Sequence, residues 1–178
     1  TVRLVGMSRY GCRDTAYNNV RVYPNPKSIF SQSKTDSCGP LSVQFTNASI
    51  PNDTGNISIM SFNWNMGNGI ISSGQNASAN YTASNTKDTV YTVQLVAVSE
   101  HGCRDTSYKT VRIYPKPLAL FTQNTTVGCP TLFVQFTNQS TPKDTGNINM
   151  MTFNWNFGNG VTSSAKNNLV GFSASATQ

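Results

Sequence analysis

Charged residues are scarce in this chain, and histidine is nearly absent. Lys, Arg, Asp and Glu together make up 11% of the 178 residues, and the one histidine is His101; an average soluble domain carries about 25% charged residues. The seven acids form no recognisable acid/base pair. The chain contains an internal repeat, and the position that matches His101 in the other copy is Tyr10. Such a replacement is typical of a surface residue. No Ser/His/Asp or Cys/His arrangement is possible in every copy. We therefore predict that the chain is not an enzyme.

Clustered basic residues, metal-binding cysteine pairs and long apolar runs are also missing. The net charge is +6, but Lys and Arg are scattered singly, whereas nucleic-acid binding needs a basic face; the charge favours acidic glycans or a cell surface instead. No Cys-x-x-Cys pair is present, and zinc sites need four clustered ligands, so we expect no metal and no cofactor. No stretch approaches the about 20 apolar residues of a membrane helix. We therefore expect neither nucleic-acid binding nor membrane insertion in this segment.

What the chain does have is an internal repeat that runs from end to end. Gly11–Thr15 (GCRDT) returns 91 residues later at Gly102–Thr106, and Phe62–Asn65 (FNWN) returns at Phe153–Asn156. The copies align without insertion or deletion. A period of this length matches one small β-sandwich domain of about 100 residues, and a constant period is the signature of an array. Function is therefore expected to lie in the array and not in one special site.

Alternating apolar residues predict β-strands throughout the repeat. Leu41, Val43 and Phe45 alternate with polar residues, as a half-buried strand requires, and no segment holds a helical period over three turns. β-branched residues, which favour strands, are dense. Gly67–Gly69 and Gly158–Gly160 (GNG) contain Asn-Gly, whose two residues tolerate the positive φ of a tight hairpin turn. Short, regularly spaced strands with such turns predict an all-β sandwich.

Two proline-rich segments mark the domain boundaries. Residues 23–26 (YPNP) and 114–117 (YPKP) each place two prolines within three residues, which favours a stiff, extended connection. Residues 1–25 are then the last two strands of a first domain, residues 26–116 are a complete domain, and residues 117–178 are a third domain that lacks its last two strands. Open strand edges of this kind are rarely tolerated. Either the segment continues into a longer chain, or the N-terminal hairpin of one subunit completes the third domain of its neighbour.

The tryptophan motif and its surroundings resemble the polycystic kidney disease (PKD) domain family, over essentially the whole chain. The segments that carry the resemblance are residues 38–47 (CGPLSVQFTN), 62–69 (FNWNMGNG) and 91–95 (YTVQL). The resemblance implies tandem immunoglobulin-like (PKD) β-sandwich domains, as in the arrays on bacterial surfaces that are exported by type IX secretion. The family's hallmark is Trp-Asp-Phe-Gly-Asp-Gly. Both copies here carry Asn at the two acidic positions, which weakens any carry-over of the calcium binding shown by some relatives.

We interpret this motif as structural in both copies. Trp64 and Trp155 are expected to lie buried at equivalent places on a central strand, because a large aromatic side chain fills much of a small core. The asparagines at the former Asp positions still hydrogen-bond the local backbone. The glycines that close the hairpin turns are Gly67, Gly69, Gly158 and Gly160.

The four cysteines predict disulfides if the array is exported. In the sandwich that the resemblance implies, Cys38 lies where the domain ends and Cys103 lies in the turn before the last strand, at the opposite end. Their separation then exceeds the about 7 Å between Cα atoms that a disulfide allows. We therefore predict bridges between neighbouring domains, in which Cys38 and Cys129 pair with the Gly-Cys turn of the next domain, and Cys12 and Cys103 with the domain before. The alternatives are a Cys38–Cys103 bridge inside one domain and free buried thiols.

The sequence also carries two candidate modification sites. Asp14-Thr15-Ala16 and Asp88-Thr89-Val90 match the short O-glycosylation pattern of the bacteria whose arrays this chain resembles. Thr15 and Thr89 are therefore candidates for O-glycosylation.

The functional hypothesis is a non-catalytic structural or adhesive segment of an extracellular surface protein, a stalk or filament built from PKD-like sandwiches. Its expected partners are neighbouring repeats or subunits of the same array, joined head to tail, and surface glycans. The alternative is a carbohydrate- or protein-binding accessory module of a secreted hydrolase. Many near-identical copies in the full gene favour the stalk, and one or two copies beside a catalytic domain favour the accessory module.

Overall fold

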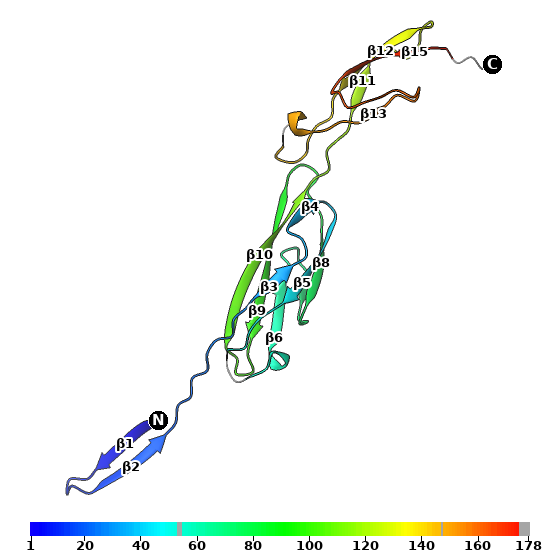
Figure 1. The fold of residues 1–178 in the computed structure, drawn as a ribbon. Coiled ribbons are helices and arrows are strands. Elements are labelled where there is room, and N and C mark those ends of the chain that lie inside the picture. The colour runs from blue at the N-terminus through cyan, green and yellow to red at the C-terminus, as the bar shows by residue number, and fades with distance from the viewer. Residues whose placement is uncertain (53–54, 147, 175–178) are drawn as a thin grey trace. The chain divides into compact units, whose positions relative to one another are not determined.

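The regular secondary structure of the chain is almost entirely β-strand in the computed structural model, which describes residues 1–52, 55–146 and 148–174 (Figure 1). The helical turns among these residues are the 3-10 turns η1 (Ile57–Ile59) and η2 (Ile148–Met150). In chain order the strands are β1 (Val2–Met7), β2 (Arg13–Asn18), β3 (Phe30–Gln32), β4 (Asp36–Cys38), β5 (Leu41–Asn47), β6 (Ser61–Asn65), β7 (Ile71–Ser72), β8 (Ala77–Tyr81), β9 (Thr89–Val98), β10 (Arg104–Tyr114), β11 (Phe121–Gln123), β12 (Leu132–Asn138), β13 (Trp155–Asn156), β14 (Thr162–Ser163) and β15 (Asn168–Phe172).

Residues 26–116 form a sandwich of two sheets, which we call the central sandwich. One sheet has the strand order β4-β10-β9-β6-β7 and the other has the order β3-β5-β8. Phe30 on β3 and Phe45 on β5 pack against Trp64 on β6, with ring centroids 5.2 and 6.1 Å from that of the tryptophan. Because these contacts join the two sheets face to face, the predicted all-β, immunoglobulin-like sandwich is confirmed.

The strand pattern of the sequence explains which residues form the core. On β5 the buried residues Leu41, Val43 and Phe45 alternate with exposed polar residues, and the same alternation occurs on β6. Successive side chains of a strand point to opposite faces of the sheet, so one face of each strand enters the core. Leu95 on β9 and Val111 on β10 are fully buried. Each such aliphatic side chain contributes about 1.5–3 kcal/mol when it is removed from water.

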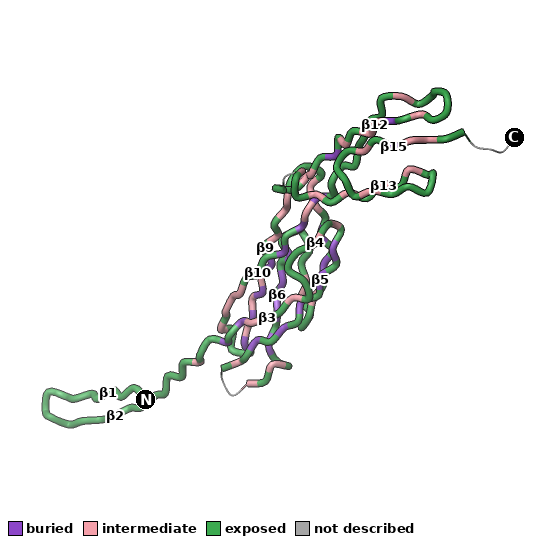
Figure 2. The backbone as a smooth tube through the Cα atoms, turned by 45° about the horizontal axis from the view of Figure 1, so that its top comes forward, coloured by how far each residue is buried: buried purple, intermediate pink, exposed green. Residues whose placement is uncertain are grey.

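The hairpin β1–β2 has the same local fold as β9–β10 but covers no core. In both hairpins the amide of the serine before the turn donates to the carbonyl of the cysteine after it, from Ser8 to Cys12 and from Ser99 to Cys103, at 2.9 Å in each case. Gly11 and Gly102 have φ of 82° and 80°, a conformation that favours glycine. Every residue of β1 and β2 is exposed, as Figure 2 shows by the unbroken green of this segment.

We call residues 117–174 the third repeat. Its sheets are β11-β12-β15 and β13-β14, and its described residues contain no counterparts of β9 and β10. Trp155, which we expected to be buried like Trp64, is half-buried, and Phe121 is 51% exposed where its counterpart Phe30 is 3% exposed. The expectation of equal burial was wrong, because no strands that match β9 and β10 pack on this aromatic cluster among the described residues.

A tyrosine in the core makes the stability of the central sandwich sensitive to alkaline pH. Tyr81 is fully buried on β8, and burial, together with the nearby Tyr91, raises its pKa from 10.0 to about 12. The folded state therefore holds this proton more tightly than the unfolded state, so stability is unaffected below pH 10 and falls as the pH rises from 10 to 12. The expected loss is about 2 to 3 kcal/mol, since one pKa unit corresponds to about 1.4 kcal/mol.

Urea unfolding of the wild type and the Tyr81→Phe variant between pH 8 and 12 tests this expectation. Phenylalanine already occupies the matching position of the repeat, as Phe172, so the substitution is compatible with the fold. The stability of the variant should fall less steeply above pH 10. Parallel curves for the two proteins would show that another group causes any alkaline loss.

Candidate functional site

The Gly-Asn-Gly turn of the central sandwich is held by its asparagine side chains. Asn65 Oδ1 accepts from the amide of Gly67 at 2.9 Å, and Asn68 Oδ1 accepts from the amide of Ile70 at 3.1 Å. Gly67 and Gly69 have positive φ, at 76° and 88°, whereas Asn68 does not. The expectation of a turn with asparagine at positive φ was therefore wrong, because the two glycines on either side supply that conformation and leave Asn68 to cap the turn.

The third repeat builds the same turn. Asn156 Oδ1 accepts from Gly158 at 3.0 Å and Asn159 Oδ1 accepts from Val161 at 3.1 Å, while Gly158 and Gly160 have φ of 79° and 85°. Each of the four asparagines thus has an acceptor oxygen engaged by the backbone. Within the described residues no group of three or more His, Cys, Asp or Glu side chains is placed to hold a metal ion.

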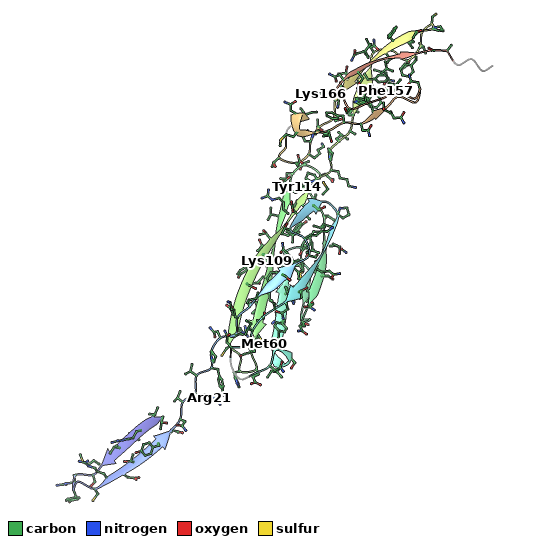
Figure 3. The ribbon with its side chains drawn as sticks, in the orientation of Figure 1. Arg21, Met60, Lys109, Tyr114, Phe157 and Lys166 are labelled. Carbon is green, nitrogen blue, oxygen red and sulfur yellow. The ribbon has the colours of Figure 1, made fainter. Side chains whose placement is uncertain are left out.

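The cysteines of the central sandwich lie at opposite ends of its longest strand. Cys38 ends β4, which runs parallel to β10 with Cys38 opposite Tyr114 (labelled in Figure 3), and Cys103 directly precedes β10. At about 3.3 Å per residue, the 11 residues of β10 separate the two cysteines by about 36 Å. This distance excludes a Cys38–Cys103 bridge inside one domain. All four cysteines are free thiols in this structure, and disulfide formation stays a prediction.

The linker residue Tyr23 packs on the turn that contains Cys103. The ring of His101 stacks on that of Tyr23, with centroids 3.5 Å apart and planes 23° from parallel. Cys103 Sγ lies 3.8 Å from the carbonyl oxygen of Tyr23. His101 is exposed, as predicted, but its ring also holds the linker. The sequence carries a signal for this role that we did not use, since the matching position, Tyr10, is also aromatic.

Asp105 of the GCRDT motif ties the start of the central sandwich to its last strand. Its Oδ2 accepts from the amide of Ser28 at 2.7 Å, and the buried Ser28 hydroxyl also contacts Ser107 Oγ at 2.7 Å and donates to the carbonyl of Leu95. Its counterpart one repeat earlier, Asp14, instead makes a local bond, in which Oδ1 accepts from the amide of the next residue, Thr15. The long-range bond of Asp105 was missed because its partner lies 77 residues away.

The two candidate glycosylation sites differ in accessibility. Thr15 is exposed on β2. Thr89 begins β9, is half-buried, and its hydroxyl accepts from the amide of Ser84 at 3.0 Å. Modification at either residue stays a prediction, and Thr15 is the more accessible of the two.

These features define a class: an all-β sandwich module in which motifs that recur in the repeat hold turns, linker and core. Among the described residues no helix is long and apolar enough to cross a membrane. Trp64 lies in the core of the central sandwich, and the asparagines of the Gly-Asn-Gly motifs hold their turns.

Comparison with known proteins identifies solved structures that this chain resembles. No protein-family model and no curated protein matches the chain. Among solved structures the chain is similar to the PKD1 domain of Vibrio anguillarum Epp, with 26% identity over 53% of this chain and 100% of that one and a TM-score of 0.42. It is also similar to the PKD1 domain of the Vibrio cholerae metalloprotease PrtV, with 29% identity over 51% of this chain and 98% of that one and a TM-score of 0.40.

A third solved structure belongs to carbohydrate-binding modules of the β-sandwich superfamily. It shares 18% identity with this chain, over 66% of this chain and 56% of its own length, with a TM-score of 0.45. The resemblance to PKD domains that the sequence carries is thus also found among solved structures.

Proposed function

We propose that this chain is a segment of a non-catalytic, extracellular stalk or filament on a cell surface, built from tandem PKD-like sandwiches. The observation that carries the proposal is that two copies of the repeat build the same core. The centroids of Phe30 and Trp64 lie 5.2 Å apart, and those of Phe121 and Trp155 lie 5.3 Å apart. In a stalk each copy contributes length and stability in the same way, so the same core recurs in each.

The linkers suit such a stalk because they limit bending between domains. Two prolines in three residues favour an extended connection, and the stacking of Tyr23 on His101 adds a contact between the linker and the domain that follows it. A strand of the length of β10 gives each domain about 36 Å. Domain lengths joined by stiff linkers add, so many copies reach far from a surface.

The full-length reading frame, combined with electron microscopy of the protein released from the cell surface, tests the stalk. Many near-identical copies are expected, together with a thin unbranched particle whose length grows by at least about 36 Å per repeat. One or two copies beside a catalytic domain would overturn the stalk and support the accessory module of a secreted hydrolase.

We further propose that disulfides join neighbouring domains of the array. Cys38 lies opposite Tyr114 in the β4–β10 pair, and Tyr23 is the counterpart of Tyr114 in the repeat. In a continuous array we expect the Cys38 counterpart of the preceding repeat to lie opposite Tyr23 in the same way. Cys103 Sγ lies 3.8 Å from the carbonyl oxygen of that same Tyr23, so we expect the two thiols of consecutive domains to meet at this joint.

The bridge would form by thiol–disulfide exchange with an oxidised dithiol carrier. The two cysteines lose two protons and two electrons, and the carrier's disulfide is reduced to two thiols. Mass spectrometry of unreduced peptides from the native array should show a cysteine at the position equivalent to Cys38 joined to the cysteine at the position equivalent to Cys103 in the next repeat. Alkylation of all cysteines as free thiols would contradict the bridge while leaving the stalk standing.

A further inference from the structure

The outer face of the sheet β11-β12-β15 is apolar, whereas the same face of the central sandwich is polar. Phe133 on β12 and Leu169 on β15 point away from the core, on two strands that pair side by side (Figure 1), and are 62% and 64% exposed. Their counterparts in the repeat are Ser42 and Ser78, which are also exposed. The third repeat therefore presents an apolar patch where the other copy presents hydroxyl groups.

The exposure of this patch does not come from an uncovered core. The patch lies on the side of the sheet away from the aromatic cluster around Trp155, because successive side chains of a strand point to opposite faces. In the central sandwich β9 and β10 complete the opposite sheet, and Ser42 and Ser78 are exposed all the same. The patch is therefore part of the outer surface of the sandwich.

A third difference between the copies makes room for the phenyl ring. Phe133 lies opposite Gly171 in the β12–β15 pair, and the counterpart of Gly171 is Asn80. A Cβ atom at position 171 would lie 3.2 Å from Phe133 Cε1 and 3.4 Å from Thr131 Cγ2, so the ring lies against the glycine backbone. Phe133, Leu169 and Gly171 together form one feature, which we call the phenyl platform.

The phenyl platform has a side-chain amide beside it and no charge. Gln135 lies opposite Leu169 and about 7 Å from Phe133 along the same face of β12. Its Nε2 donates to the carbonyl of Phe136 at 3.2 Å, which leaves Oε1 as an acceptor. The strands β11, β12 and β15 contain no charged residue, although the chain has a net charge of +6. A ring with a fixed amide and no charge suits a neutral ligand.

We propose that the phenyl platform binds a neutral, β-linked oligosaccharide whose sugar rings carry equatorial hydroxyl groups. The C–H groups of such a ring make its two faces apolar, so one face stacks on the open side of the Phe133 ring. The hydroxyl groups at the rim of the sugar are then placed to donate to Gln135 Oε1. The inference goes beyond the proposed function and does not rest on it, because a stalk segment and an accessory module can both carry such a site.

Size and charge favour this occupant over another protein or an acidic polymer. An aromatic side chain buries about 150–250 Å², so Phe133 with Leu169 stays well below the about 800 Å² that each partner contributes to a stable protein interface. A nucleic acid or an acidic glycan requires basic side chains, and β12 and β15 contain none. A small, uncharged ligand with an apolar face fits both observations.

NMR titration of the full 178-residue chain with cellohexaose and with chitohexaose, two neutral β-linked oligosaccharides, tests the platform. The amides of residues 131–135 and 169–171 should shift, with a Kd on the order of 1 mM, because a single open ring gives weak binding. Phe133→Ser, which installs the residue of the matching position Ser42, should weaken binding roughly tenfold or more. The matched control is Ile71→Ser, at an apolar residue of the central sandwich that is 79% exposed, and it should bind like the wild type.

The central sandwich allows the reverse test. The triple variant Ser42→Phe, Ser78→Leu, Asn80→Gly transfers the phenyl platform to it, since each substitution installs the residue of the other copy. This variant should show a second set of shifts at the amides of β5 and β8. Should it fail to fold, the comparison of Phe133→Ser with Ile71→Ser still decides.

Three results would overturn the proposal. The first is the absence of shifts with both oligosaccharides at about ten times the expected Kd, or equal binding by Phe133→Ser and the wild type. The second is binding of hexagalacturonate alone, which would assign any glycan contact to the scattered basic residues. The third is self-association of the chain that Phe133→Ser abolishes, seen in sedimentation velocity under reducing conditions, which would make a second copy the occupant. Each of these results leaves the stalk proposal and its reading-frame test unaffected.

Discussion

Replacement of Trp64 by alanine is expected to lower the free energy of unfolding of the central sandwich by about 3–5 kcal/mol, as aromatic truncations in cores do. The side chain is 2% exposed, packs on Phe30 and Phe45 from the facing sheet, and donates its indole N–H to the carbonyl of Gly74. Alanine would leave a cavity between the sheets and an unpaired carbonyl. Hydrogen exchange of the amides of β5 and β9, followed by mass spectrometry, measures the change locally.

The chain provides a matched control for this substitution in Trp155. The same residue with the same indole hydrogen bond is half-buried there, so Trp155→Ala should cost the third repeat clearly less than Trp64→Ala costs the central sandwich. Equal costs would mean that burial by β9 and β10 is not what makes the tryptophan important.

Leu95→Ala is expected to destabilise the central sandwich by about 2–5 kcal/mol. Leu95 is fully buried and lies opposite Trp64 in the β6–β9 pair, so its removal opens the core beside the largest side chain. Leu4→Ala, the same change one repeat earlier, should alter the stability of the monomer by less than about 0.5 kcal/mol, because Leu4 is 70% exposed. Both are measured by hydrogen exchange of the 178-residue chain; a large local effect of Leu4→Ala would contradict the structure.

The sequence alone predicts the parts of this fold that rest on local pattern. The alternation of Leu41, Val43 and Phe45 depends only on the two-residue period of a strand, and the Gly-Asn-Gly turns depend on residues next to one another. The 91-residue repeat transfers each such prediction to the next copy. These features therefore follow from neighbours in the chain.

The features that the sequence did not predict depend on distant partners. Asp105 contacts Ser28 across 77 residues, and no local pattern distinguishes it from Asp14, which bonds its own neighbour. The half-burial of Trp155 has the same cause, since the residues around it match those around Trp64 and only the covering strands differ. Closely similar sequence thus gives different burial where different strands pack on it.

The parallel pairing of β4 with β10 has a consequence for how a single domain bears tension. The chain enters the central sandwich through residues that lead into β3 and β4, and leaves it from the end of β10. A pull along the chain therefore draws these two strands past each other in opposite directions, so that the bonds of the pairs Asp36–Arg112, Ser37–Ile113 and Cys38–Tyr114 are sheared together and not peeled apart one by one. The amide of Gly39, which donates to the carbonyl of Tyr114 at 3.0 Å, extends this shear patch to the first residue after β4. Resistance to rupture along this axis is then governed by the rate at which the whole patch yields, so a pull on the two ends of the domain loads all of these bonds at once.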